Sequence, residues 1–249
     1  FCNFATYLQY INYAKFNETD ELWNITGEFS AADYTLNIAW SYNIDTFFSI
    51  GAILKPLYSV YESYISFGIA FDFGISYFSK NRNIIAGLVF RNIGTQIKPY
   101  TPNNFEPLPF DIQAGISVKL NHAPLRFSLL AHHLNVPNLG YTIPSDNTQL
   151  LNQTTSKSKI GNIIDLTLRH FIASAEILPS EHFYISLGFD YQRRQELKID
   201  NKPATTGFSI GLGIKIQKFS FNYALSKYHL AGSTNNFTLS LNMYQIFNR

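Results

Sequence analysis

The stretches FYISLGFDYQ (residues 183–192) and GFSIGLGIKI (residues 207–216) decide the fold. In both, every second residue is apolar and bulky, and the residues between them are small or polar. Successive side chains of a β-strand point to opposite faces, so each stretch predicts a strand with one apolar face. The charged, proline-containing loop RRQELKIDNKPATT (193–206) joins them. Two such strands with a polar loop are typical of a transmembrane β-barrel hairpin.

The composition of the whole chain agrees with this interpretation. Of its 249 residues 14% are charged and 16% are aromatic, whereas an average soluble domain has about 25% charged residues. The formal charge of +2 gives no reason to expect a nucleic-acid partner. No stretch approaches the roughly 20 apolar residues of a transmembrane helix. These features favour an outer-membrane barrel over a soluble β-sandwich, which stays the alternative.

The single cysteine, Cys2, predicts neither an intrachain disulfide nor a zinc site. The first residues, FCNFATYLQYINY, have no basic start and already alternate like a strand. We therefore expect the chain to be a fragment of a longer protein whose export signal and N-terminal part are missing.

The alternation recurs along residues 1–249 and predicts a single domain of about twelve strands. The clearest strands are 33–42 and 67–77, each with one aromatic and aliphatic face and one small or polar face. The expected strands are 4–13, 33–42, 47–58, 67–77, 83–92, 110–120, 125–134, 164–178, 183–192, 207–216, 219–227 and 237–244.

The connections between these strands alternate in length. Those after even-numbered strands are short, and most of those after odd-numbered strands are long and polar; the link near Glu62 is the exception. Bacterial barrels have short periplasmic turns and longer external loops. The sequence therefore predicts an all-β, antiparallel up-and-down transmembrane β-barrel. Its expected outer loops are residues 15–32, 94–109, 135–162 and 193–206.

The histidines give no sign of a metal site. Metal sites need convergent ligands at suitable spacing, and the adjacent His132 and His133 are expected on opposite faces of a strand. We expect no metal, and we expect histidines at the rim or in the interior of the barrel. The six histidines are His122, His132, His133, His170, His182 and His229.

Catalytic motifs are also missing from the sequence, which has no GxSxG and no phosphate-binding loop. Gly211 and Gly213 are expected to relieve crowding inside a strand. Asp72 and Asp190 fall on the predicted inner face, where we expect them to pair with cations and not to form a catalytic dyad. The candidate cations are Lys55, Arg91, Arg126 and Lys215. We therefore predict a protein that is not an enzyme and has no cofactor.

The loop 193–206 begins with the only candidate partner-binding residues, Arg193, Arg194, Glu196 and Lys198. They form either an ordinary solvated loop or a contact with an anionic lipopolysaccharide head group or a partner protein at the outer rim.

Several stretches together resemble the PorQ family of the type IX secretion system. They are YAKFNETDELWNITGEFSAADY (13–34), KPLYSVYESY (55–64), EPLPFDIQAGIS (106–117), NHAPLRFSLLAHHL (121–134), LPSEHFYISLGFDYQRRQELKID (178–200) and KFSFNYALSKYHLAGSTNNFTLS (218–240). The resemblance covers essentially the whole chain, and QRRQEL and YHLAG are its most specific parts.

The resemblance implies an integral outer-membrane barrel of fourteen strands, related to PorV and, more distantly, to FadL-type fatty-acid transporters. It implies that the protein anchors a PorZ-like surface partner in an attachment complex with PorV and the sortase PorU, which attaches secreted cargo to lipopolysaccharide. It implies no catalytic residues. The alternative function is FadL-like transport of small hydrophobic molecules across the outer membrane.

Overall fold

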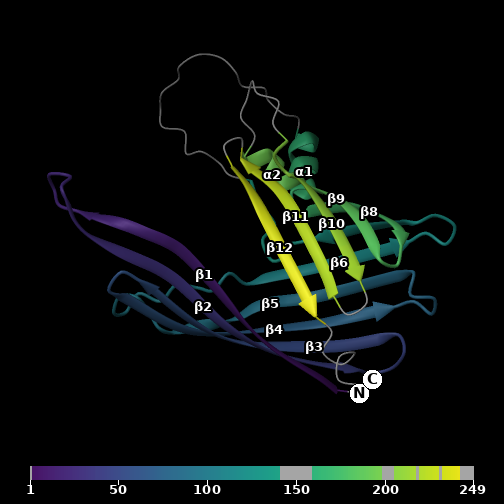
Figure 1. Cartoon of the computed structure of the whole chain (residues 1–249), viewed down its shortest axis with the longest axis horizontal. Helices are drawn as coiled ribbons and strands as arrows, with labels where there is room; N and C mark the ends of the chain where they lie inside the picture. Colours follow the sequence, from purple (N-terminus) through teal and green to yellow (C-terminus); the bar gives the residue numbers. More distant parts are fainter. Residues whose placement is uncertain (1, 141–158, 198–204, 217–218, 230–231, 242–249) are drawn as a thin grey trace, which may run out of the picture. The chain divides into compact units, whose positions relative to one another are not determined.

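The computed structural model describes residues 2–140, 159–197, 205–216, 219–229 and 232–241, and this part of the chain is almost entirely β-structure (Figure 1). In chain order the elements are β1 (Cys2–Thr19), β2 (Ile25–Asn43), β3 (Phe48–Tyr61), β4 (Tyr64–Phe78), β5 (Ile84–Lys98), β6 (Asp111–Lys119), β7 (Leu125–Ala131), α1 (Lys159–Leu168), β8 (Phe171–Ser180), β9 (Phe183–Asp190), α2 (Tyr191–Leu197), β10 (Phe208–Ile216), β11 (Phe219–His229) and β12 (Gly232–Leu241).

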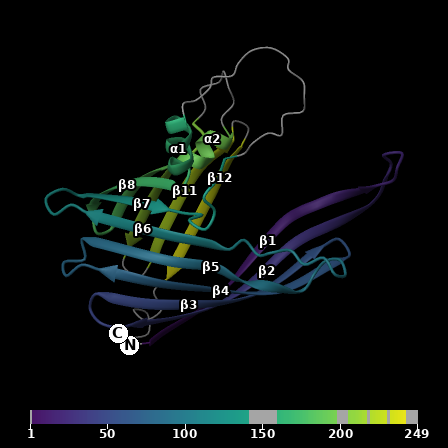
Figure 2. The same ribbon diagram turned by 180° about the vertical axis from the view of Figure 1, so that it is seen from behind.

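The strands follow one another in the sheet in the order in which they occur in the sequence, from β1 to β12 (Figure 2). The pairs whose registers are described are antiparallel, as in an up-and-down meander. The predicted fold class and the predicted twelve strands are thereby confirmed. The strand order begins with β1 and ends with β12, and the sheet is not closed.

The chain divides into two compact units. The first contains Phe1–Lys80 and Ala86–Gln113, and the second contains Asn81–Ile85 and Ala114–Arg249. Each unit therefore has its own packing, and the faces of the sheet are described separately for each.

In the first unit the small and polar side chains lie on the covered face of the sheet. Along β4, Ser66, Ala70 and Asp72 are buried, whereas the intervening Phe71 and Phe73 are 47 and 44% exposed. We call the face of Ser66, Ala70 and Asp72 the inner face and the opposite one the outer face. The strand registers place Ser59, Lys55, Asp33 and Asn37 on the inner face as well. The faces predicted for residues 33–42 and 67–77 are therefore confirmed.

The distribution of polarity is the reverse of that in a water-soluble domain. In soluble proteins the large apolar side chains are the most buried. Among the described residues, the buried apolar side chains are Ala31 and Ala70 alone, and the buried polar ones are Asn37, Lys55, Ser66, Asp72, Asp111, His132 and Thr206. Many large aromatic and aliphatic side chains are exposed instead. This distribution is typical of a β-barrel that turns its apolar face to lipid.

Aromatic residues form two groups on the outer face of the first unit. Tyr34 stacks on Tyr10 with 4.9 Å between ring centroids and lies 6.1 Å from the ring of Tyr58. Further along β2, Tyr42 stacks parallel to Trp40. The path from Tyr34 to Tyr42 is about 26 Å at the usual rise of a strand. A transmembrane barrel strand needs about 9–11 residues, and its apolar band is flanked by aromatic girdles.

In the second unit the glycines of β10 accommodate side chains from the neighbouring strand. A Cβ atom at Gly213 would lie 1.9 Å from the ring of Tyr184, and one at Gly211 would overlap Ser186 Oγ. The Tyr184 hydroxyl donates a hydrogen bond to Asn222 Oδ1 at 3.0 Å across β10. The prediction that Gly211 and Gly213 relieve crowding is confirmed.

The predicted outer loop 15–32 is wrong, because most of it is strand. β1 continues to Thr19 and β2 begins at Ile25, so the loop shrinks to residues 20–24. Cross-strand pairs extend the hairpin: Lys15 Nζ lies 3.1 Å from Glu28 Oε2, and Phe16 stacks on Phe29. A bulge near Ala14, which has φ of 70°, shifts the register between the two parts of the hairpin.

Two helices replace predicted irregular or strand segments. Residues 164–168, expected as the start of a strand, belong to α1, and β8 begins only at Phe171. The ion pair between Asp165 and Arg169 spans one helical turn, as does the bond from Thr167 Oγ1 to the Ile163 carbonyl. The first residues of the predicted loop 193–206 are helical in α2.

Candidate functional site

Hydrogen bonds to the Asp20 carboxylate stabilise the loop between β1 and β2. Asp20 Oδ1 accepts hydrogen bonds from the backbone N–H groups of Leu22 and Asn24, both at 2.8 Å. Its other oxygen accepts a bond from Asn24 Nδ2 at 3.0 Å. These hydrogen bonds lower the pKa of Asp20 below its ordinary value of 3.8. The bond from the Asn24 side chain has the largest effect, and the bond from the Asn24 backbone has the next largest. Trp23 takes a left-handed φ of 64° within this turn.

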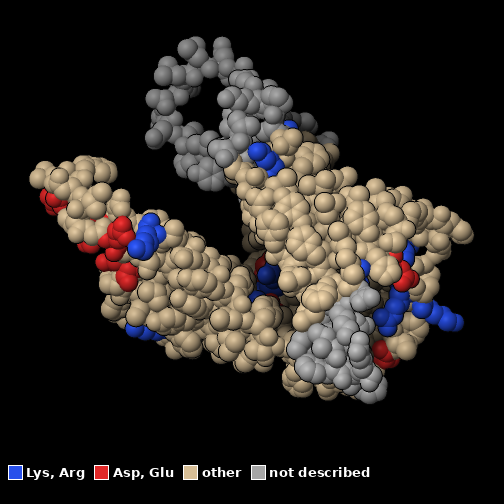
Figure 3. All heavy atoms as spheres, viewed as in Figure 1, with Lys and Arg blue, Asp and Glu red and all other residues tan. Residues whose placement is uncertain are grey.

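The turn presents large apolar side chains to solvent. Leu22 is 80% exposed, Trp23 is 86% exposed and Ile25 is 66% exposed. We call residues 18–25 the hairpin tip. The hairpin tip carries the carboxylates of Glu18, Asp20 and Glu21, and Glu28 lies just beyond it. The one lysine of this region, Lys15, forms an ion pair with Glu28. The acidic residues of the arm formed by β1 and β2 are visible in Figure 3. The hairpin tip therefore combines an apolar end with an acidic surround.

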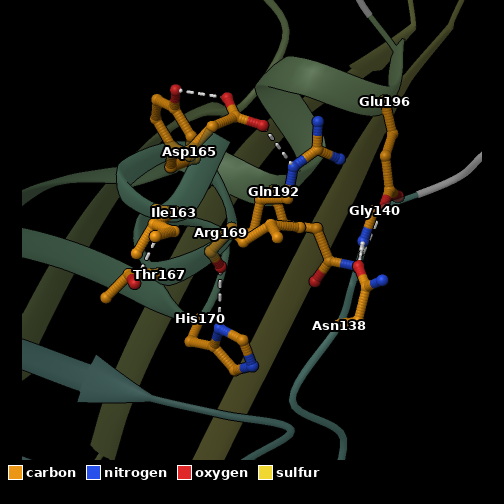
Figure 4. A network of polar contacts seen from close by, with 11 residues as sticks. Asn138, Gly140, Ile163, Asp165, Thr167, Arg169, His170, Gln192 and Glu196 are labelled. Atoms are coloured by element: carbon orange, nitrogen blue, oxygen red, sulfur yellow. Dashed lines mark hydrogen bonds and ion pairs between the residues drawn. The ribbon is translucent and has the colours of Figure 1, made fainter. Parts of the chain in front are cut away.

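In the second unit a polar network ties α1 to α2 (Figure 4). Arg169 Nε lies 3.0 Å from Asp165 Oδ2, and each of these side chains is 14% exposed. The Tyr191 hydroxyl donates to the other oxygen of Asp165 at 2.9 Å. The pKa of Tyr191 is raised above its ordinary value of 10.0. The main cause is burial of the hydroxyl, and the second is its hydrogen bond to Asp165. One carboxylate of α1 thus holds the first residue of α2.

His170, directly after α1, joins the network to the segment that follows β7. Its Nδ1 lies 2.9 Å from the Leu166 carbonyl oxygen and its Nε2 lies 3.0 Å from the Val136 carbonyl oxygen. The backbone N–H of Gly140 donates to Asn138 Oδ1 at 2.8 Å in the same region (Figure 4). These contacts make α1 part of a folded connection with defined side-chain positions.

The predicted binding residues of the loop 193–206 do not converge on one point. Arg193 donates its backbone N–H to Asp190 Oδ1 at 3.0 Å, and its guanidinium lies 3.5 Å from Asp190 Oδ2. Arg194 reaches the buried Thr206 hydroxyl at 3.4 Å. Glu196 is exposed and accepts a bond from Gln192 (Figure 4). Lys198 lies outside the described residues. The two arginines therefore fasten α2 to the ends of β9 and β10.

His132 and His133 directly follow β7. In the described ranges no three metal-ligating side chains come together. The expectation that His132 and His133 point to opposite faces is wrong: their rings meet edge to face, 4.7 Å apart, because β7 ends at Ala131 and His133 has φ of 54°. Neither α1 nor α2 has the length and apolarity that a membrane-crossing helix requires.

The sequence interpretation missed Leu22 and Trp23, which it treated as part of a general polar loop. The sequence does contain a pattern that could have predicted this turn, since Asp20 and Asn24 flank two large apolar residues. Asp and Asn side chains stabilise short turns by forming hydrogen bonds to the backbone. Such a turn exposes whatever lies at its centre.

Comparisons with known proteins give little beyond this geometry. No protein-family model matches the chain, and no curated protein matches it. Among solved structures, a triple mutant of the porin of Rhodopseudomonas blastica is similar, with 8% sequence identity and a TM-score of 0.35. The match covers 96% of this chain and 88% of the porin chain. Similarity at this level does not assign a function.

Proposed function

We propose that this protein is a non-enzymatic outer-membrane β-barrel that holds a protein partner at the cell surface. The membrane location is supported by the reversal of polarity between the two faces of the sheet, with Asp72 buried and Phe71 and Phe73 exposed beside it. Aromatic side chains on the outer face of a β-barrel are covered by the lipid of the membrane. One observation supports the proposed role in retaining a partner: Trp23 is exposed on a turn whose shape is fixed by Asp20.

A tryptophan fixed in this way suits protein binding. Tryptophan is enriched among the residues that contribute most to protein–protein affinity, and a rigid turn reduces the entropy lost on binding. The hairpin tip follows β1, an odd-numbered strand, as do the helical connections after β7 and β9. In an up-and-down barrel the long external loops follow alternate strands.

The partner that fits this tip has an apolar pocket bordered by basic residues. The carboxylates of Glu18, Asp20 and Glu21 would steer it to the site and favour it over acidic competitors. Together with the resemblance to the PorQ family, this supports a PorZ-like surface protein as the partner and the type IX secretion system as the setting. Lipopolysaccharide at the rim is part of the same proposal.

The test is retention of the partner by the full-length protein carrying L22S and W23S. We expect these substitutions to abolish co-purification of the partner from outer-membrane extract, while migration in detergent gels stays heat-modifiable as in the parent. F105S is the matched control, because Phe105 is also exposed, at 58%, but lies in the connection after β5. Undiminished co-purification with the altered hairpin tip would refute its role in retention.

Transport of a small hydrophobic molecule is the second candidate, because one pocket has a largely apolar lining. It has a volume of about 360 Å³ and lies beside α1. Its lining residues are Leu134, Pro137, Ile163, Leu166, Thr167, His170 and Phe171. Uptake of labelled fatty acid into liposomes carrying the full-length protein, reduced by L166D and unaffected by L22S with W23S, would favour transport over retention.

A further inference from the structure

The inner face of the second unit carries an excess of positive charge near its short turns. We use the same definition here, the face of the small and polar side chains, which in this unit includes Ser186 and Gly211. The register places Lys119 of β6 directly opposite Arg126 of β7. Lys215, near the end of β10, lies beside His182, whose carbonyl accepts its backbone N–H at 2.7 Å. Three cations from three strands thus surround one region.

These cations line a pocket of about 620 Å³. Its other polar lining includes the Tyr184, Ser220 and Asn222 side chains. The lining residues come from β6 to β11 and from the turn between β8 and β9. Glu181 is the single carboxylate among these residues, so the lining has a formal surplus of positive charge even with neutral histidine.

An ion pair with Glu176, which is not part of the lining, reduces this formal surplus from two positive charges to one. Arg126 Nη1 lies 3.1 Å from Glu176 Oε2, and the two side chains are 35 and 25% exposed. Glu176 thereby fixes the position of the guanidinium. Within the described ranges, neither Lys119 nor Lys215 forms an ion pair, and both are exposed.

A bound anion would relieve the repulsion between the cations of this pocket. Like charges directly opposite each other on one face of a sheet are destabilising, and Lys119 faces Arg126 in this way. A guanidinium binds carboxylate or phosphate through paired hydrogen bonds, and ammonium groups add point charges. The pocket offers one guanidinium and two ammonium groups.

We propose that this pocket binds a small soluble solute carrying two or more oxyanion groups, either phosphates or carboxylates. The apolar tails of lipids belong on the opposite, outer face of the sheet, so the position of the pocket favours a soluble polyanion over a lipid head group. This site goes beyond partner retention and shares no residue with the hairpin tip.

The test is calorimetric titration of the full-length protein in a non-ionic detergent with pyrophosphate and with citrate, using sucrose as the uncharged control. We expect saturable binding of at least one polyanion that weakens at high salt, and none of sucrose. Binding of pyrophosphate alone would identify phosphates as the ligand groups, and binding of citrate alone would identify carboxylates. K119Q with K215Q should weaken binding about tenfold or more, which corresponds to at least 1.4 kcal/mol.

The matched control is K15Q with K80Q, which changes the net charge equally but alters exposed lysines of the first unit. It should leave the affinity within about twofold of the parent. Absence of saturable binding, or equal weakening by both double variants, would overturn the proposal. Heat-modifiable migration of each variant verifies that the barrel has folded.

Discussion

Lys55 and Asp72 form an ion pair on the inner face of the first unit, where their side chains are 11 and 10% exposed. Asn92 completes the arrangement: its backbone N–H donates to Asp72 Oδ1 at 2.8 Å, and its Oδ1 accepts from Lys55 Nζ at 3.2 Å. Lys55 was among the partners expected for Asp72 from the sequence, and this expectation is confirmed. A satisfied polar network thus occupies the covered side of the sheet.

Breaking this pair should destabilise the protein far more than removing both charges. D72A or K55M leaves one buried charge without its partner, and we expect a loss of about 3–5 kcal/mol of unfolding free energy. The double variant K55M/D72L should lose less than either single variant. Urea unfolding in detergent, followed by tryptophan fluorescence, measures all three. Losses below about 1 kcal/mol for the single variants would mean that water screens the pair.

The alternation of side chains predicted the strands because a barrel imposes it along each membrane-crossing segment. From Ser66 to Tyr77 of β4 every inner position is small or polar and every outer one is bulky, so the face of Asp72 followed directly from parity. Strand ends were predicted less well. The hairpin beyond the apolar band is stabilised by cross-strand pairs such as Lys15–Glu28, which look like ordinary loop residues in sequence.

The helical connections could not be predicted because their stabilising contacts are distant in sequence. Asp165 of α1 binds Tyr191 of α2, and His170 binds the carbonyl of Val136. From the sequence, Arg193 and Arg194 were expected either in a solvated loop or in a contact with a partner, and in the structure both contact residues at the ends of neighbouring strands. A pattern of charges alone does not distinguish an anchoring arginine from a free one.

The network between the helices can be tested at Asp165. D165A removes both the ion pair to Arg169 and the bond from Tyr191, and we expect amide hydrogen exchange in residues 191–197 to accelerate. Loss of hydrogen bonds to a charged group costs about 1.5–3 kcal/mol, which corresponds to roughly 10- to 150-fold faster exchange. Y191F, which removes one of these bonds, should give an intermediate effect. Unchanged exchange in D165A would show that α2 is held by Asp190 and Thr206 instead.

Gly94 is predicted to tolerate no side chain. A Cβ atom there would lie 2.0 Å from the Ile69 carbonyl oxygen and 2.7 Å from Ala70 Cα, and these backbone atoms cannot turn aside. G94A should therefore cost about 1–3 kcal/mol by forcing the backbone apart. G232A is the control, because no atom lies within 4 Å of the added Cβ. Equal urea midpoints for the two variants would contradict the close approach at Gly94.

The hairpin tip should depend on pH through Asp20. Because folding lowers the pKa of Asp20 below 3.8, its stabilising effect is fully present above that value and is lost as the pH falls through the lowered pKa. The chain has two tryptophans, so W40F leaves Trp23 as the single reporter. In this background, acrylamide quenching of Trp23 should stay constant from neutral pH to about pH 4 and change only under more acidic conditions.

Two substitutions at Asp20 distinguish a pH effect on the turn from unfolding of the whole protein by acid. D20A removes the acceptor, so the Trp23 signal should have its acid-state value even at neutral pH. D20N keeps an oxygen that can accept the N–H groups of Leu22 and Asn24 but does not titrate, so the acid transition should disappear while the neutral signal is retained. A transition that persists unchanged in D20N would assign the pH dependence to another group, and the turn would then not owe its shape to the Asp20 carboxylate.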